Sequence, residues 1–232
     1  MRSLNLILAA LLLLSLVLAA YVVQRLGGWR YTLYRLEHRE AGLYRHRIDL
    51  FERLPDRPGA IVFLGDSHVE QCEWAELTGQ PNALNRGITG DHTQGVLARL
   101  NETLRHRPRL IVLMVGINDL LLGRSAEETV ADYRQIVRQI RRESPQTELL
   151  LISVLPVNPQ IKRIRIDNAL IRSLNTHIAT VAREYALPYI DLYAECADAE
   201  QRLSARLTDD GIHLNGQGYI LLKKNIARYW EN

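Results

Sequence analysis

Four short segments, far apart in the chain, carry the groups that an acyl-transfer site needs. A serine hydroxyl attacks a carbonyl carbon efficiently only when a base removes its proton, and a histidine oriented by a carboxylate is such a base. Backbone N–H groups and a neutral side-chain amide can then stabilise the negative oxygen that forms. The four segments contain all of these groups: Gly65-Asp66-Ser67, Asn85-Arg86-Gly87, Gly116-Ile117-Asn118-Asp119 and Asp210-Gly211-Ile212-His213.

The expected nucleophile is Ser67, which follows an apolar run and precedes a helix predicted to begin near Val69. A tight turn at this position would expose the hydroxyl and aim the first N–H groups of the helix toward it. His213 is the expected base, and Asp210, three residues earlier, is expected to fix its tautomer. Asp209 is the alternative for the acid.

Three donors are expected to hold the oxyanion: the N–H of Ser67, the N–H of Gly87 and the side-chain amide of Asn118. Glycine lets the backbone approach a ligand closely, and an amide donates without titrating. We expect the charged residues nearby to hold these loops in place without reacting: Asp66, Arg86, Asp91 and Asp119.

Other polar residues are interpreted as structural. His68 adjoins the nucleophile, but consecutive residues at such a turn point in different directions, so we do not expect it to be the base. Val157 and Asn158 follow the fourth predicted strand and either line the pocket or form a proline turn. Three further histidines are interpreted as solvated or as hydrogen-bonded in the core: His92, His106 and His177.

The elements that must position these groups alternate between strands and helices. Apolar strands joined by amphipathic helices predict a parallel sheet covered on both faces, because a sheet with one solvated face would alternate in polarity. The carboxyl ends of such strands share one edge, where ligands bind. We therefore predict a flavodoxin-like α/β three-layer sandwich with a five-stranded parallel sheet in the order 2-1-3-4-5. The predicted strands are 60–64, 83–85, 110–115, 148–154 and 188–191, and the helices are 69–77, 93–105, 126–143, 164–185 and 215–229.

The N-terminus predicts a membrane segment. Nearly every residue from Leu4 to Val23 is apolar, and about 20 such residues cross a bilayer as a helix. We predict that residues 1–26 form a transmembrane anchor or uncleaved signal segment; the alternative is a cleaved signal peptide. The arginines from Arg25 to Arg39 favour a cytoplasmic domain, whereas the short N-terminal tail favours export. We expect the domain to lie on the periplasmic side of a bacterial inner membrane.

Residues 27–59 are predicted to link this segment to the catalytic domain, residues 60–232. Apolar residues recur on one helical face between Trp29 and Leu54, which indicates an amphipathic stalk helix. A helix that belongs to the domain core is the alternative. The turn-forming stretch from Pro55 to Gly59 ends the segment.

Composition excludes several classes of protein. The chain has 232 residues, 47% of them hydrophobic, and a net charge of +3 without a basic stripe, so nucleic acid is not an expected partner. Cys72 and Cys196 have no metal-ligand spacing, and we expect no metal and no cofactor. They are interpreted as unpaired or buried thiols, with a disulfide as the alternative in an oxidising compartment.

From Ala60 to the C-terminus the four segments, in this order, resemble the SGNH hydrolase superfamily, also called GDSL-type esterases and lipases. The stretch Asn85 to Asp91 and the run Leu110 to Leu120 are similar to the branch that contains platelet-activating-factor acetylhydrolase. The resemblance implies that Ser67, His213 and Asp210 form the triad. His68 departs from the family, which usually has an aliphatic residue after the serine.

The resemblance implies a serine esterase that cleaves carboxylic esters through an acyl-enzyme, and the apolar N-terminus predicts that this esterase is anchored in a membrane. Short-acyl, acetyl-type esters of carbohydrate or lipid are the expected small-molecule substrates. A lysophospholipase or thioesterase-like lipid hydrolase and an O-acetyltransferase are alternatives, and a non-catalytic interaction protein on a hydrolase scaffold is an alternative of another class. The sequence does not decide between a monomer and a homodimer.

Overall fold

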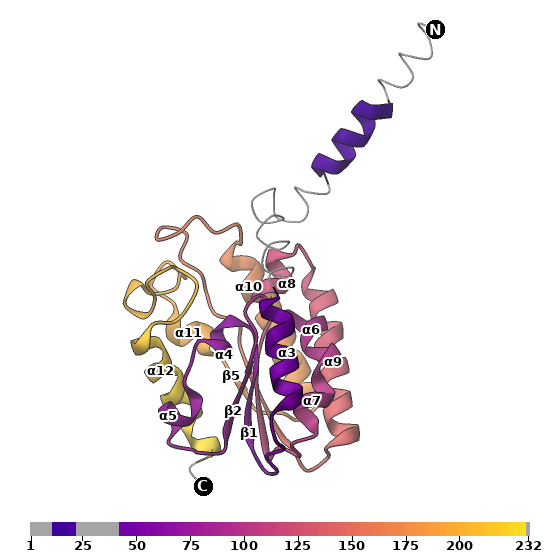
Figure 1. Cartoon of the computed structure of the whole chain (residues 1–232). Helices are drawn as coiled ribbons and strands as arrows, with labels where there is room; N and C mark the ends of the chain where they lie inside the picture. Colours follow the sequence, from indigo (N-terminus) through magenta and orange to yellow (C-terminus); the bar gives the residue numbers. More distant parts are fainter. Residues whose placement is uncertain (1–10, 22–41, 231–232) are drawn as a thin grey trace, which may run out of the picture.

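The computed structural model describes residues 11–21 and 42–230 of the chain. Its main body is an α/β fold around a five-stranded parallel sheet in the order β2-β1-β3-β4-β5 (Figure 1). The predicted fold class and strand order are confirmed. The strands are β1 (Ile61–Gly65), β2 (Ala83–Gly87), β3 (Leu110–Met114), β4 (Glu148–Ile152) and β5 (Tyr189–Ile190).

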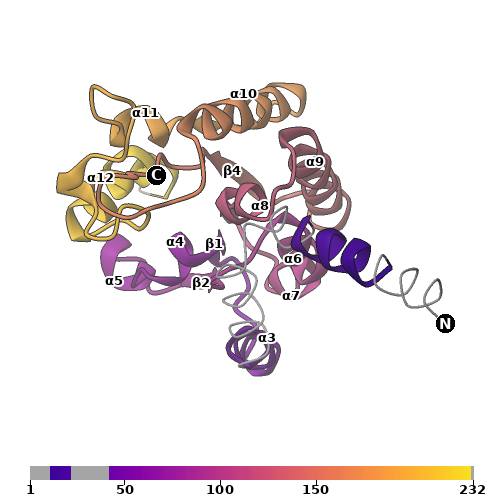
Figure 2. The ribbon, with the colours of Figure 1, turned by 90° about the horizontal axis from the view of Figure 1, so that it is seen from above.

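Helices cover both faces of the sheet (Figure 2). Every residue of β1 and β3 is buried, as expected for parallel strands between two helical layers. One layer contains α6 (Thr93–Ala98), α7 (Leu100–Leu104), α9 (Ala126–Glu143) and α10 (Asn168–Glu184). The other contains α4 (Ser67–Glu70), α5 (Trp74–Thr78), α11 (Leu192–Cys196) and α12 (Gly216–Ile226). The short helix α8 (Ile117–Leu121) follows β3, and 3₁₀ turns span Ala205–Leu207 and Ala227–Tyr229.

Four of the five predicted helices differ in extent from those of the structure. The predicted helix 215–229 is α12, which ends at Ile226 and continues as a 3₁₀ turn. The predicted helix 93–105 is divided at Arg99, whose backbone leaves helical geometry (φ −109°, ψ 13°) while its side chain reaches the sheet edge. The predicted helix 69–77 is divided into α4 and α5. The helix predicted to begin at Ile164 begins at Asn168 instead, because the Asp167 carboxylate accepts the N–H of Ala169 and caps it.

The helix α3 (Leu43–Arg53) precedes the sheet and packs beside its edge strand β2. The Phe51 ring is buried, and the guanidinium of Arg86 in β2 lies 4.5 Å from its centroid. At the other end of α3, Arg47 donates to the carbonyl oxygen of Gly87 (3.1 Å) and pairs with Glu70. The part of the predicted stalk that the structure describes is therefore packed on the domain.

Residues 11–21 form a helix with exposed side chains. Within the two described ranges, no helix is both long enough and apolar enough to span a membrane. The rest of the predicted membrane segment, residues 1–10 and 22–26, and the stalk residues 27–41 lie outside the described part of the chain.

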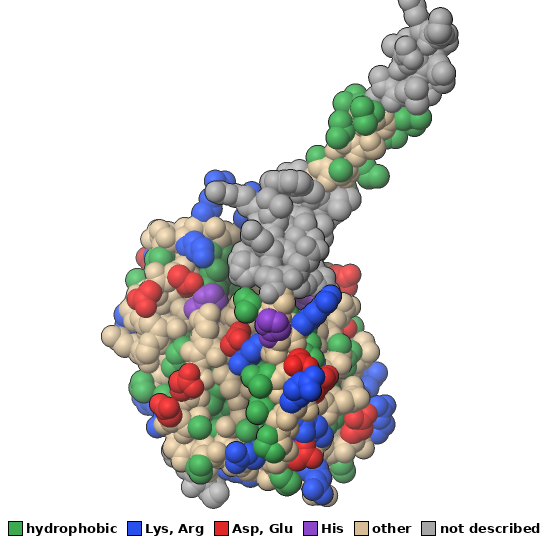
Figure 3. All heavy atoms as spheres, viewed as in Figure 1, with side chains coloured by type: hydrophobic (Ala, Val, Ile, Leu, Met, Phe, Trp, Pro, Cys, Tyr) green, Lys and Arg blue, Asp and Glu red, His purple; other side chains and the backbone are tan. Residues whose placement is uncertain are grey.

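The cysteines and the surface charge agree with the sequence analysis. Cys72 and Cys196 are buried and unpaired, and burial raises the pKa of each thiol to about 12. On the face drawn in Figure 3, basic and acidic side chains are interspersed. This face shows no stripe of one sign that would track a nucleic-acid backbone.

A buried ion pair joins the carboxyl ends of β1 and β2. Arg99 donates to Asp91 (Nε to Oδ2, 2.8 Å) and to the carbonyl oxygens of Gly65 (3.0 Å) and Arg86 (2.9 Å). Both side chains of the pair are at most 5% exposed. Removal of one partner from such a pair leaves a buried charge without compensation, which is strongly destabilising.

We predict that Arg99→Leu lowers the free energy of unfolding by about 3–5 kcal/mol, because the Asp91 carboxylate stays buried without its cation. Urea unfolding of the full chain in mild detergent, followed by circular dichroism, measures this change. The matched control is Arg134→Leu, which removes a surface pair with Glu184 and should change stability little. A loss from Arg99→Leu no larger than the control's would contradict the prediction.

Candidate active site

The structure brings together the serine, histidine and aspartate that the sequence predicts. Ser67 Oγ lies 2.9 Å from His213 Nε2, and His213 Nδ1 lies 2.7 Å from Asp210 Oδ2. Ser67 is 5% exposed, whereas the side chains of His213 and Asp210 are partly exposed. Asp209 has an exposed side chain, and Asp210 is the carboxylate that contacts the imidazole.

The nucleophile turn is held by close backbone packing. Gly65 ends β1 so near to β3 that a Cβ atom there would lie 1.9 Å from the carbonyl oxygen of Met114. The Asp66 carboxylate then accepts the N–H of His68 (3.0 Å) and caps α4, in which Ser67 is the first residue. Ser67 therefore lies at the carboxyl edge of the sheet.

The base loop is held by its own aspartate. Asp210 Oδ1 accepts the N–H groups of Ile212 (2.9 Å) and His213 (2.8 Å), so the carboxylate folds back onto the imidazole. Gly211 between them has φ +81°, a conformation that suits glycine. Its carbonyl oxygen accepts the N–H of Asn158 (2.7 Å). Val157 and Asn158 are both buried, and Asn158 holds the base loop through this hydrogen bond to Gly211.

The electrostatics favour an ionised aspartate and a neutral histidine. Burial opposes the charge of Asp210, but its hydrogen bonds from the His213 and Ile212 N–H groups and from the imidazole lower its pKa to about 2. Burial and the nearby His68 lower the pKa of His213, and this outweighs the opposite effect of Asp210. A general base acts in its neutral form, so a lower pKa keeps His213 competent in more acidic solution.

Two of the three predicted oxyanion donors, Asn118 and Ser67, lie at this edge, and each has an N–H that can donate to a ligand. Asn118 is the second residue of α8, which begins after Gly116 (φ +132°), and its side-chain amide donates to the carbonyl oxygen of Asp91 (2.8 Å). An amide nitrogen has two hydrogens, so the second stays available. Within the described residues, no hydrogen bond occupies the Ser67 N–H.

The structure does not place Gly87 with these donors. Its N–H donates to Asn85 Oδ1 (2.9 Å) and its carbonyl oxygen accepts from Arg47. A Cβ at this position would lie 2.1 Å from the backbone nitrogen of Glu70. Gly87 therefore permits close packing of β2 against α4, and its N–H is already satisfied.

Gly90 offers an N–H that the sequence analysis missed. It lies in the turn between Ile88 and Asp91, whose N–H donates to the Ile88 carbonyl (3.0 Å), and no bond among the described residues occupies its own N–H. Its φ is +80°, and a Cβ there would meet nothing within 4 Å. The sequence signal is the Gly90-Asp91 pair, because a glycine at a turn marks a positive φ.

The charged residues predicted to hold the loops do so. The Asp91 carboxylate accepts hydrogen bonds from the Arg99 guanidinium and the N–H of His92. The Asp119 carboxylate accepts them from the N–H and the hydroxyl of Thr93. Arg86 pairs with Glu102. The other histidines also contact neighbours: His92 caps α6, His106 is buried beside Arg86, and His177 lies on the surface of α10.

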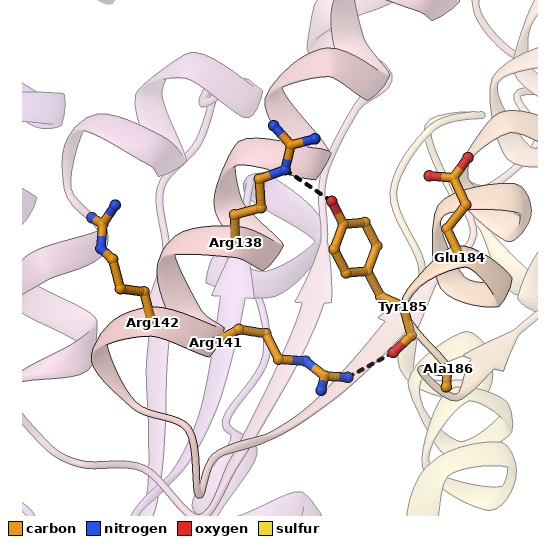
Figure 4. Close-up of a pocket in the computed structure, with 6 residues that line it drawn as sticks. All are labelled: Arg138, Arg141, Arg142, Glu184, Tyr185 and Ala186. Carbon is orange, nitrogen blue, oxygen red and sulfur yellow. Dashed lines mark hydrogen bonds between the residues drawn. The ribbon is translucent and has the colours of Figure 1, made fainter.

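Among the described residues, one hollow lies beside the triad and a larger one lies away from it. One, beside the nucleophile turn, encloses about 10 Å³ and is lined by Asp66 and His68 among other residues. A larger one, of about 620 Å³, is lined by arginines at the end of α9 and by Tyr185 after α10 (Figure 4). Those helix ends lead into β4 and β5, so this hollow lies at the amino edge of the sheet, away from the triad.

Across the described residues, no group of three or more His, Cys, Asp or Glu side chains is arranged to hold a metal ion.

Comparisons with known proteins agree with this geometry. The GDSL-like Lipase/Acylhydrolase family matches residues 63–221. The platelet-activating factor acetylhydrolase IB subunit alpha1 of Homo sapiens is 34% identical over 174 residues, which cover 71% of this chain and 72% of that protein.

Two solved structures are similar in fold. A GDSL-like lipase from Bacteroides thetaiotaomicron has a TM-score of 0.70 at 24% identity, over 80% of this chain and 96% of that one. The lipase/acylhydrolase from Enterococcus faecalis has a TM-score of 0.64 at 25% identity, over 73% and 94%. Fold and matches together define an ester-hydrolysing serine hydrolase. The chain belongs to the GDSL-like lipase/acylhydrolase family, and the predicted resemblance to the SGNH superfamily is confirmed.

We predict that Asn118→Ala lowers kcat by about 10² to 10³ with a smaller change in KM, the usual effect of losing one oxyanion donor. Steady-state hydrolysis of p-nitrophenyl acetate measures both constants. Asn101→Ala, on the exposed surface of α7, is the control and should leave both unchanged. An unchanged kcat in Asn118→Ala would assign its amide to holding the Asp91 carbonyl alone.

Proposed function

We propose that this chain hydrolyses carboxylic esters with short acyl groups, such as acetyl esters of carbohydrate or lipid, through an acyl-enzyme on Ser67. The observation that carries the proposal is the continuous hydrogen-bonded path from Ser67 Oγ through His213 to Asp210. Such a path activates a serine without a metal ion or an organic cofactor.

The reaction follows from the positions of these groups. Ser67 Oγ bonds to the carbonyl carbon of the ester while its proton passes to His213 Nε2, and Asp210 stabilises the imidazolium that results. The N–H groups of Ser67 and Gly90 and the Asn118 amide hold the oxyanion. His213 then gives its proton to the departing alcohol oxygen as the ester C–O bond breaks. Water, deprotonated by the same histidine, releases the acid and restores Ser67.

Two observations support a short acyl group. The hollow beside the nucleophile turn encloses about 10 Å³, so it does not bury a long acyl chain. An acyl chain gains about 0.8 kcal/mol per CH₂ only where a groove buries it. The similar alpha1 subunit is named as an acetylhydrolase, and we extend an acetyl preference from that name to this chain.

We predict that kcat/KM is highest for acetate to butyrate in a series of p-nitrophenyl esters, and does not increase for octanoate and decanoate. Methylenes that stay in water add nothing to transition-state binding. The series is measured with the full chain in detergent, and Ser67→Ala, which keeps the fold but lacks the nucleophile, is the control. A steady rise toward decanoate would instead support a lysophospholipase-like lipid hydrolase. Retained turnover in Ser67→Ala would contradict the catalytic assignment.

We also propose that the N-terminal segment anchors the hydrolase in a membrane, with the domain on the periplasmic side. The apolar run from Leu4 to Val23 supports this. The helix α3, next along the chain, contacts the loops at the carboxyl edge of the sheet: Tyr44 donates to Asp91 (3.2 Å) and Arg47 to Gly87. A tether at that point keeps the site close to the bilayer.

We predict that the full chain stays in the membrane pellet after a carbonate wash, and that Leu12→Arg with Leu16→Arg releases it, because charges at the centre of a span are costly. Leu50→Arg, on an exposed position of α3, controls for added charge. Recovery of the unmodified chain in the soluble fraction would contradict the anchor.

A reporter fused after Asn232 should be active on the extracytoplasmic side, and a reporter active in the cytoplasm would reverse the assigned orientation.

A further inference from the structure

His68 links the nucleophile turn to the base loop. Its imidazole is 4% exposed and lies between two oxygen atoms. Nδ1 is 3.3 Å from Asp66 Oδ1, and Nε2 is 2.9 Å from the carbonyl oxygen of Ile212. Ile212 directly precedes His213, so the side chain after the nucleophile contacts the residue before the base.

Both neighbours of the His68 ring are hydrogen-bond acceptors. A neutral imidazole has one N–H and one lone pair, so in either tautomer one of these contacts would set a lone pair against an oxygen. An imidazolium donates to both oxygens, and the Asp66 carboxylate supplies the opposite charge that a buried cation needs. Burial alone would lower the pKa of His68, but the hydrogen bonds and charge of Asp66 and the Ile212 carbonyl raise it.

The His68 ring also lies close to the proposed base. The centroids of the His68 and His213 rings are 5.4 Å apart, so a proton on one disfavours a proton on the other. Asp66 and Asp210 favour positive charge on the imidazoles, and Tyr219, whose hydroxyl donates to the His68 carbonyl (2.8 Å), has a pKa raised by burial and stays neutral.

We infer that His68 is a positioning residue that acts as a fixed imidazolium. It holds the base loop against the nucleophile turn through Ile212, and its charge keeps His213 in the neutral form that accepts the Ser67 proton. The inference rests on the proposed roles of Ser67 and His213. The usual aliphatic residue of the family could supply neither the second hydrogen bond nor the charge.

The kinetic test separates the charge from the hydrogen bond. His68→Gln retains a donor but cannot become a cation, and His68→Leu removes both; His177→Gln, on the surface of α10, is the control. The kcat/KM for p-nitrophenyl acetate is measured from about pH 5 to pH 8, after thermal unfolding shows which variants are folded. Loss of the cation raises the pKa of His213, so the acid limb moves to higher pH. Each kcat/KM is divided by the plateau value of the same protein. At a pH on the acid limb, this ratio should be about threefold or more lower in His68→Gln than in the wild type.

A second measurement decides the point without any catalysis. Nitrogen chemical shifts of isotope-labelled histidines in the wild-type chain, assigned to His68 by comparison with His68→Gln, should show protons on both ring nitrogens of His68 at neutral pH. A neutral His68, or an acid limb in folded His68→Gln that matches the wild type, would overturn the inference. If the wild type hydrolysed no ester at all, the proposed function would fail, while the chemical shifts would still report the charge of His68.

Discussion

The site depends on the buried pair between Arg99 and Asp91. Parallel strands end at a common edge, but the loops beyond them share no ladder of hydrogen bonds and need another connection. Arg99 supplies it by donating to the Gly65 carbonyl at the end of β1 and the Arg86 carbonyl near the end of β2, as well as to Asp91. The Asp91 carbonyl in turn receives the Asn118 amide from the loop after β3. One guanidinium therefore fixes three loops that carry the nucleophile and the oxyanion donors.

Much of this arrangement could be predicted from local sequence, and the rest could not for physical reasons. Continuous apolar strands and the polar residues after them are local patterns, so the parallel sheet and the place of Ser67 and Asn118 at its edge follow from them. The approach of His213 to Ser67 was expected from the family resemblance. Gly87 ends β2 and Gly90 lies in the turn that follows it, and only the contact with Asn85 shows that the Gly87 N–H is already bonded. The break at Arg99 was missed because its cause, two distant carbonyls, is tertiary.

The nucleophile turn and the base loop reach each other along two parallel routes. One is the proton path from Ser67 to His213, and the other runs from Asp66 through His68 to Ile212. From the sequence, His68 was only a departure from the aliphatic residue that usually follows the serine in the family. Its contacts show that the residue replaces apolar packing with a polar link between loops that are 144 residues apart in the chain. A buried polar link of this kind specifies one relative position of two loops more narrowly than apolar contact does.

The position of α3 changes what counts as the hydrolase unit. The family match begins at residue 63, yet Arg47 holds the Gly87 carbonyl and Glu70, and the Phe51 ring packs under Arg86. Cutting the chain before β1 would expose these partners to water beside α4 and the end of β2. The hydrolase domain therefore includes a helix upstream of the matched segment.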